Sequence, residues 1–416
     1  MSTNTLKINP FPPISNGMDN VAANIEMFCR DIGFGHDIQD CEVRQGGNHN
    51  VIMFSYVPFP LSDPTHPPPS NHRQLCILRT RKEIFKDSSD MACEDTKRIV
   101  AAMHSYGEAG AYPSKLPIPA VLAYDAMYDN AIGCPYIIQR RAAGNDLQKW
   151  YEDLDAALPA DGPYNLTERL IIAEEMAVFI ASMENSFQFQ KYGDLIHGAS
   201  MPDKNMAFSG EEIEMRIRGP SVGDVQTPGS LNHVDYFESL ISAHIAATGI
   251  SQAAHQNLVK LEKIFKQMKQ WELLDQFNAV PTLFHRDLYP RNVIFDCAET
   301  DGEMKLTAVI DWDNTVVLPR IMTREPPYWL WANNILPKEH RKVVEEHFYE
   351  HVERLLPGYR EDAEGRDASV VRALYVYAFW GPCYGYHSEL SFEELLEEFE
   401  AMRVEGSEEM EAEEMF

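Results

Sequence analysis

The chain changes its secondary-structure pattern near residue 144, and this change limits the folds open to it. Before that point short β-like runs dominate, with one helix-like segment at 88–107 among them. After it, long segments carry apolar residues at helical spacing, as at 252–277, 338–356 and 367–380. A strand-rich part followed by a helix-rich part predicts a bilobal α+β fold, with a β-rich N-lobe that contains one helix and a larger α-rich C-lobe.

Composition shifts along the chain suggest four segments. Residues 1–18 are polar and proline-rich, which indicates a flexible lead-in. The β-rich N-lobe is predicted at 19–143 and the α-rich C-lobe at 144–402. The remainder, 403–416, is dominated by glutamate, and such a run of like charges predicts a disordered acidic tail.

The overall charge and the cysteines exclude several classes of function. A net charge of −28 argues against binding nucleic acid or an anionic membrane, because both partners need a basic surface. The seven cysteines form no CxxC pair, which is typical of a reducing compartment. The start of the chain carries no apolar signal segment, and no apolar run reaches membrane-spanning length. We therefore expect a cytoplasmic protein; the sequence does not indicate its oligomeric state.

The stretch "LFHRDLYPRNVIFD" (283–296) places an acid and an amide in one loop between two apolar runs. Phosphoryl transfer needs a carboxylate near the acceptor hydroxyl, a metal on the phosphates and positive charge around them. Asp287 can be that carboxylate, and Asn292 can offer a neutral oxygen to Mg²⁺. Asp311, in "AVIDWDN", directly follows a β-like run and can supply the acidic ligand. Protein kinases use this order of residues.

The β-rich part contains candidates for the phosphate-binding groups. Gly46 and Gly47 lie between two β-like runs, where their backbone can approach an anion. In the next run, "LCILRTR", Arg79 shares one face with its neighbours at alternate positions, and it is the preferred phosphate-binding base over Arg81 and Lys82. On the following helix, Glu94 is the preferred partner for that base, with Asp95 as its rival.

Together, these motifs resemble the aminoglycoside phosphotransferase family, which includes choline and homoserine kinases and has a protein-kinase-like fold. The family pattern is close to "HGDLHPGN" followed by "IDWE", and this chain has "HRDLYPRN" and "IDWD". The segment "GCPYIIQRRAAGNDLQKW" resembles the connector of the family, and "PPYWLW" after "IDW" resembles its fungal branch. The resemblance extends from about 20 to 400.

The resemblance implies a role for each matching residue in the Mg²⁺-dependent transfer of phosphate from ATP or GTP to the hydroxyl of a small molecule. Asp287 would be catalytic, with Asn292 and Asp311 as the metal ligands and His285 as a support for the loop. The nucleotide would be bound by residues of the N-lobe and the connector, namely Gly46, Gly47, Asn50, Arg79, Glu94, Ile138, Gln139 and Arg140.

Three departures from the family pattern leave alternatives open. Arg79 stands where many members have Lys, and Arg140 stands where the connector often has Glu. A nucleotide-binding protein with weak or no turnover therefore remains a second hypothesis. A protein kinase is a third, although 208 residues separate Arg79 from Asp287 and no Ala-Pro-Glu segment follows Asp311. "IDWDN" also lacks the further Asp often found after this motif in bacterial members.

Other polar residues are predicted to be structural. Asp313 is expected to be a solvated turn residue rather than a second acid at the metal. The 14 histidines form no HExxH pattern, and we predict that they are not metal ligands. The aromatic segment 375–389 is expected to be mostly core, although Trp380, Tyr384 and His387 could line an acceptor pocket.

Overall fold

A computed structural model of the chain describes most residues between 19 and 413. The described ranges are 19–45, 49–59, 73–81, 89–107, 116–151, 166–198, 201–205, 215–218, 221–222, 225–226, 232–247, 250–277, 280–297, 304–332, 336–381 and 390–413.

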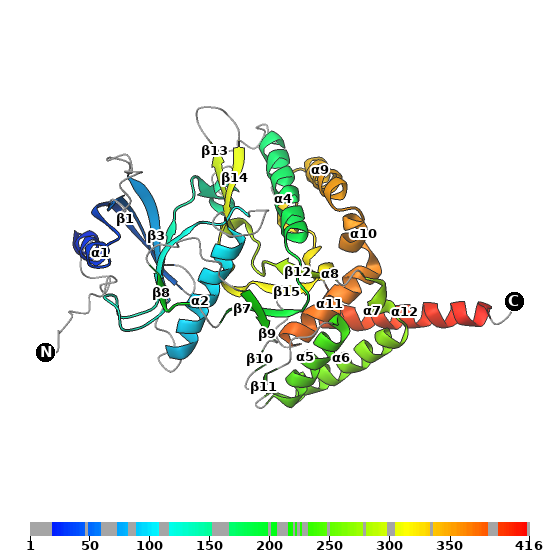
Figure 1. Cartoon of the computed structure of the whole chain (residues 1–416). Coiled ribbons are helices and arrows are strands. Elements are labelled where there is room, and N and C mark those ends of the chain that lie inside the picture. Colours follow the sequence, from blue (N-terminus) through cyan, green and yellow to red (C-terminus); the bar gives the residue numbers. More distant parts are fainter. Residues whose placement is uncertain are drawn as a thin grey trace. The chain divides into compact units, whose positions relative to one another are not determined.

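The chain forms two compact units, and each is built from three stretches of sequence (Figure 1). The first contains most of the strands and comprises Met1–Tyr151, Ile196–Arg216 and Leu288–Asp313. The second contains most of the helices and comprises Glu152–Leu195, Ile217–Asp287 and Asn314–Phe416. The predicted α+β class is therefore confirmed. The predicted boundary at 144 lies close to the end of the first stretch, but the strand-rich unit also takes two later segments that the sequence analysis assigned to the C-lobe.

A six-stranded antiparallel sheet forms the centre of the first unit. Its order is β1-β2-β3-β5-β4-β8. The strands are β1 (Gly35–Gln45), β2 (His49–Pro58), β3 (Gln74–Arg81), β4 (Val121–Asp125), β5 (Tyr136–Arg140) and β8 (Lys204–Asn205). The β-like runs recognised in the sequence up to residue 141 correspond to β1–β5.

The two faces of this sheet carry different side chains: one is apolar and packs on α1, and the other carries Arg79. Helix α1 (Asp19–Asp31) packs against the sheet, and its Ile25 and Phe28 are fully buried together with Ile52 and Leu78. Because side chains alternate along a strand, Arg79 lies on the opposite face from Leu78. Helix α2 (Ser89–Tyr106), predicted at 88–107, follows β3 in the chain. The position of Arg79 thus follows from the register of the strand.

A smaller three-stranded sheet completes the first unit. Its order is β14-β13-β6, with β13 (Val293–Cys297), β14 (Met304–Val309) and the two-residue strand β6 (Asn145–Asp146). Gly144, just before β6, has φ +95°, and a Cβ at this position would lie 1.9 Å from the carbonyl oxygen of Phe295. Only glycine fits this close approach. The predicted connector is therefore held against β13, the strand that forms the end of the 283–296 stretch.

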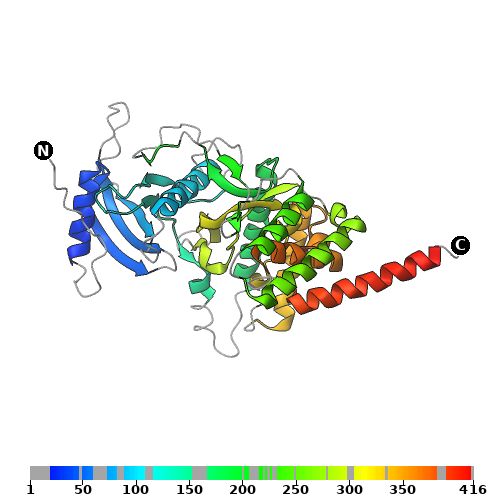
Figure 2. The ribbon, with the colours of Figure 1, turned by 90° about the horizontal axis from the view of Figure 1, so that it is seen from below.

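The helical unit has a large aromatic core. In Figure 2 the helices α5 (His233–Ala246), α6 (Gln252–Gln270) and α11 (Arg366–Trp380) lie together, and their buried residues form one apolar cluster. Phe237 and Tyr375 stack at its centre, with ring centroids 3.9 Å apart. The apolar stripe predicted for 252–277 is confirmed for α6, because Leu258, Leu261 and Phe265 are buried.

The other elements of the second unit lie around this core. The helices are α4 (Leu166–Ser186), α7 (Leu273–Gln276), α8 (Arg320–Thr323), α9 (Lys338–Leu355), α10 (Tyr359–Glu364) and α12 (Phe392–Glu413). A four-stranded sheet has the order β12-β15-β7-β9, from β7 (Gly193–His197), β9 (Met215–Arg218), β12 (Pro281–Phe284) and β15 (Val316–Pro319). A short hairpin pairs β10 (Ser221–Val222) with β11 (Val225–Gln226). Of the 3₁₀ turns, η3 (Tyr328–Leu330) belongs to this unit, η1 (Pro290–Asn292) belongs to the first unit, and η2 (Trp312–Asn314) spans the point where the chain passes from the first unit to the second.

The C-terminal segment differs from its prediction. Helix α12 continues to Glu413 (Figure 2), whereas the sequence analysis predicted disorder from residue 403. Glutamate, methionine and alanine have high helix propensity, so the segment can continue the helix in spite of its charge. None of the described helices is both long enough and apolar enough to cross a membrane.

Candidate functional site

Arg79 is a buried cation on the face of the sheet opposite α1. In the β3 register it pairs with Val51 of β2 and Ile137 of β5, which places it in the middle of the sheet rather than at an edge. Its side chain is only 10% exposed. A buried guanidinium must be paired, because an isolated charge in this environment would carry a large desolvation penalty.

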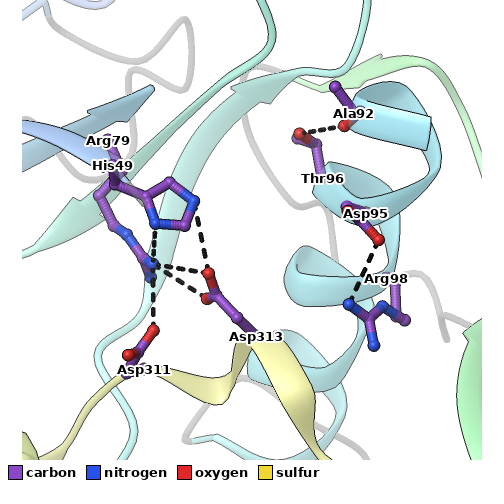
Figure 3. Close-up of polar contacts among 8 residues, drawn as sticks. All are labelled: His49, Arg79, Ala92, Asp95, Thr96, Arg98, Asp311 and Asp313. Carbon is purple, nitrogen blue, oxygen red and sulfur yellow. Dashed lines mark hydrogen bonds and ion pairs between the residues drawn. The ribbon is translucent and has the colours of Figure 1, made fainter. Parts of the chain in front are cut away.

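The partners of Arg79 are two aspartates that follow β14 (Figure 3). Its Nη2 lies 2.9 Å from Oδ1 and 3.2 Å from Oδ2 of Asp313, and 3.5 Å from Oδ1 of Asp311. Burial alone would raise the pKa of Asp313, but the charge and the hydrogen bonds of Arg79 hold that pKa below its ordinary value. The prediction that Asp313 is a solvated turn residue is therefore wrong, since its side chain is only 14% exposed and is ion-paired.

His49 is a member of the cluster that the sequence analysis missed. Its Nδ1 lies 3.3 Å from Nη2 of Arg79, and its Nε2 lies 3.3 Å from Oδ2 of Asp313. Because the guanidinium can only donate, Nδ1 must accept, which leaves Nε2 to carry a proton and donate to the carboxylate. A signal was present in the sequence: His49 occupies the same face of β2 as Val51, the residue opposite Arg79.

The two predicted metal ligands come to the same end of one strand pair. Val293 pairs with Val309 in the β13–β14 register, and the backbone N–H of Ile310 donates to the carbonyl of Asn292 at 2.8 Å. Asn292 and Asp311 are thus adjacent to the last paired residues of the two strands. Asn292 is 5% exposed, whereas the side chain of Asp311 is 41% exposed.

The donor set of this pair fits magnesium. An amide oxygen and a carboxylate are hard ligands, and the exposed carboxylate leaves space for the water molecules that Mg²⁺ retains. Asp311 also has φ +69°, a left-handed conformation that non-glycine residues rarely adopt. Residues in such conformations are concentrated at functional sites, where the surrounding structure stabilises them.

The predicted ion pair between Arg79 and Glu94 is wrong. Glu94 lies on an exposed face of α2, where its carboxylate is 2.8 Å from Nε2 of His197 and 3.8 Å from Nζ of Lys97. Its rival Asp95 lies 3.3 Å from Arg98 (Figure 3). The two aspartates after β14 take the place that the prediction gave to the helix acid. A role for Glu94 in nucleotide binding remains a prediction.

The predicted connector residues lie in β5. Ile138 is fully buried in the apolar core shared with α1, so only its backbone remains for a ligand. Gln139 is on the face of Arg79 and is 3% exposed, and its Oε1 accepts no hydrogen bond from the described residues. Arg140 has an exposed side chain. Asn50 alternates with His49 and therefore lies on the α1 face of β2, whereas Gly46 and Gly47 fall outside the described residues.

The catalytic-loop residues up to Asp287 belong to the helical unit. The backbone N–H of Asp287 donates to Nδ1 of His285 at 3.3 Å, and His285 is 3% exposed. This contact agrees with the predicted role of His285 as a support for the loop. Between them, Arg286 stacks its guanidinium 3.7 Å from the ring centroid of Trp380, at the end of α11. Trp380 therefore contacts the loop that carries the predicted catalytic carboxylate.

One family model matches part of the chain. Residues 243–322 match the phosphotransferase enzyme family known as APH, and this range contains Asp287, Asn292 and Asp311. The predicted resemblance to this family is confirmed by that match.

The curated relatives and the solved structures share little sequence identity with this chain. Subtelomeric hrmA-associated cluster proteins from two strains of Aspergillus fumigatus are 25% identical over 280 residues, or 54% of this chain. The chain spans about half the length of these relatives, 51%. A thermostable mutant of aminoglycoside phosphotransferase APH(4)-Ia, solved with ADP and hygromycin B, is 16% identical over 85% of this chain and 91% of its own, with a TM-score of 0.44. Ethanolamine kinase of Plasmodium vivax is 11% identical over 94% and 96%, with a TM-score of 0.40.

Proposed function

We propose that this protein is a cytoplasmic phosphotransferase that moves the γ-phosphoryl group of ATP or GTP to a hydroxyl group of a small molecule. The observation that carries the proposal is the cluster around Arg79. One buried cation contacts both Asp311 and Asp313, and Asp311 lies beside Asn292 at the end of the β13–β14 pair. Phosphoryl transfer requires this combination of a fixed positive charge and hard oxygen ligands.

Asp287 is the proposed acceptor-side carboxylate. The bond between the γ-phosphorus and the oxygen that bridges it to the β-phosphate breaks, and a bond forms between the γ-phosphorus and the acceptor oxygen. The proton of the acceptor hydroxyl passes to Asp287, and the nucleoside diphosphate leaves with the bridging oxygen. The contact of His285 with the backbone of Asp287 would fix the loop for this step.

Asn292 and Asp311 are the proposed ligands of Mg²⁺. When bound, the ion would neutralise charge on the transferring phosphate. Arg79 supplies a second, permanent positive charge, since arginine stays protonated throughout the physiological range. The partnerless Oε1 of Gln139, on the same face of the sheet, offers a buried acceptor for a donor group of the nucleotide.

The acceptor side of the reaction is less defined. Arg286 and Trp380 adjoin the Asp287 loop, and an aromatic surface beside a catalytic loop suits an acceptor with an apolar part. We propose a small molecule rather than a protein, because the matched family acts in this way and the chain lacks the Ala-Pro-Glu segment of protein kinases.

The direct test is a metabolite screen with γ-labelled ATP, and in parallel with γ-labelled GTP. The intact protein is expected to label at least one hydroxyl-bearing metabolite, and Asp287→Ala is expected to abolish the label. Asp296→Ala is the matched control, because Asp296 is also a half-buried aspartate and lies nine residues further along. Equal turnover by Asp287→Ala and the intact protein would sink the proposed mechanism.

A second candidate is a nucleotide-binding protein without turnover. One observation favours it: Asp311, a proposed metal ligand, lies 3.5 Å from Arg79, which can compete with a metal for the carboxylate. A thermal-shift assay with ATP and GTP, with and without Mg²⁺, separates the two. Metal-dependent stabilisation with slow nucleotide hydrolysis supports the enzyme. Stabilisation that ignores metal, without hydrolysis, supports the binding protein.

A further inference from the structure

Two histidines on α9 face an acidic residue of α4, and none of the three belongs to the proposed phosphotransfer site. His347 and His351 are one helical turn apart in "HFYEH", a spacing that puts both on the same face of a helix. Helices α4 and α9 pack against each other within the helical unit (Figure 1). Glu174 of α4 is the third member of the group.

The donor atoms of these three side chains converge. One ligand atom from each lies within 4.8 Å of the other two. The imidazole ring centroids are 4.3 Å apart, and Nε2 of His351 is 3.4 Å from Oε1 of Glu174. Ligand atoms bound to one ion at about 2.0–2.2 Å lie roughly 3–4 Å from each other, so small side-chain movements would suffice.

The hydrogen bonding leaves a nitrogen of His351 suited to bind a metal. Nδ1 of His351 lies 2.9 Å from the carbonyl oxygen of His347 and must donate to it. In the neutral ring the lone pair is then on Nε2, the atom that faces Glu174. A backbone carbonyl that fixes the tautomer in this way is the usual outer partner of a metal-binding histidine.

A neutral imidazole is the form that binds metal, so metal binding displaces any proton from the nitrogen that becomes the ligand. The side chain of Glu174 is 52% exposed, so an ion can reach the group from solvent.

We propose that Glu174, His347 and His351 bind a divalent transition-metal ion, preferentially Zn²⁺, and that the ion joins α4 to α9. Two imidazoles and one carboxylate form a ligand set that suits Zn²⁺ and its neighbours rather than Mg²⁺ or Ca²⁺. Three protein ligands leave one tetrahedral position for water. The site is separate in residues and in ligand type from the oxygen-only pair of Asn292 and Asp311.

The test measures Zn²⁺ binding by titration calorimetry and by thermal shift on the full chain after chelator treatment. The intact protein is expected to bind one Zn²⁺ at this site and to melt at a higher temperature with it. His351→Gln is expected to weaken binding by at least about tenfold, since even outer-shell partners of metal sites contribute 10–100-fold. Glu174→Gln, at an exposed position, is a second variant in case the first fails to fold.

Matched controls are available on α4 itself and on α6. Glu175→Gln changes the adjacent glutamate of α4, and His255→Gln removes an exposed histidine of α6. Both are expected to bind Zn²⁺ as the intact protein does. The proposal is overturned if the intact protein does not bind Zn²⁺, or if His351→Gln and Glu174→Gln bind it with unchanged affinity.

Discussion

Two buried arginines, one in each unit, differ in how far their carboxylate partners are exposed. Arg324 contacts Glu184 and Asp362, and Arg79 contacts Asp313 and Asp311. Each guanidinium thus has two carboxylate partners. The two groups differ in how completely the protein encloses them.

The group around Arg324 is closed. Its side chain is 5% exposed, that of Glu184 is 3% exposed, and the two are joined by a bidentate pair of hydrogen bonds at 2.6 and 3.0 Å. Burial would lower the pKa of Arg324, but Glu184 and Asp362 raise it above its ordinary value. Arg320 adds a further contact to Glu184 at 3.0 Å. The charges here neutralise one another.

The group around Arg79 has one open side. Asp313 is enclosed, but the side chain of Asp311 is 41% exposed and its backbone is left-handed. An exposed carboxylate beside a buried cation can take an additional ligand without breaking the enclosed pair. An accessible carboxylate is the feature that separates the Arg79 group from the Arg324 group.

The largest effect is expected where the closed group is broken. Arg324→Ala leaves Glu184 buried without its main partner, and it should lower the free energy of unfolding by about 3–5 kcal/mol. Chemical denaturation monitored by circular dichroism measures this change. Arg360→Ala is the matched control, because Arg360 also has two carboxylate partners but is 41% exposed. It should lose less than about 1 kcal/mol. Similar losses in the two variants would remove the distinction between closed and exposed groups.

In the group around Arg79, substitution of the exposed Asp311 should change catalytic activity more than it changes stability. Asp311→Asn keeps a residue that tolerates the left-handed backbone but removes the charge, and it should lower kcat/KM by roughly 10²–10³, the range found for losing one preorganised electrostatic contact. Steady-state phosphorylation of the acceptor found in the screen measures this. Asp296→Asn should keep full activity. A variant with wild-type kcat/KM would exclude Asp311 as a metal ligand.

Replacing the cation itself should have a smaller effect. Arg79→Lys keeps the charge but loses the planar guanidinium, whose Nη2 contacts both Asp313 and Asp311, and it should weaken nucleotide binding about tenfold. Nucleotide titration by calorimetry gives the dissociation constant. Arg44→Lys, on an exposed position of β1 in the same sheet, is expected to bind nucleotide normally. Unchanged binding in Arg79→Lys would mean that Arg79 does not contact the phosphates.

The smallest expected effect is a pH dependence of the free energy of unfolding that comes from His233 in the helical unit. Burial lowers the pKa of His233 below its ordinary value of 6.5, although its Nε2 donates to the carbonyl of Leu274. The unfolded chain therefore binds a proton below pH 6.5 that the folded chain resists, and stability falls as the pH decreases towards about 5. His233→Gln should flatten this slope by about 1 kcal/mol or less.

Denaturation curves between about pH 5 and 8 test this contribution. His244 is shifted in the same direction by burial, so part of the slope should persist in His233→Gln. His255→Gln, an exposed position on α6, should leave the slope unchanged. A slope that is the same in all three proteins would contradict the assignment to His233.

Sequence reasoning predicted those features that depend on local order. The alternation along β3 placed Arg79 on the correct face, and the apolar runs on either side of the loop placed Asn292 and Asp311 next to paired strands. The choice of partner for Arg79 could not be derived in this way. It depends on the tertiary position of Asp313, whose turn sequence is indistinguishable from that of a solvated aspartate.

His49 and Glu94 show the same limit. His49 adjoins a glycine pair that drew attention to backbone contacts, while its side chain takes part in the Arg79 cluster. Glu94 has the right chain order for an ion pair, but the face of α2 that carries it meets His197. Long side chains on helices reach several neighbours, and only the packed fold decides among them.

The discontinuous first unit also has a consequence for synthesis on the ribosome. Its last stretch, Leu288–Asp313, supplies β13 and the partners of Arg79, yet it is made after most of the second unit. At 5–20 residues per second, roughly 10–30 s pass between the emergence of Tyr151 and that of Asp313. During this interval Arg79 lacks its carboxylates and β6 lacks its neighbour. The nascent N-terminal segment therefore cannot complete the ion pairs of Arg79 or the pairing of β6 with β13 until Asp313 has emerged.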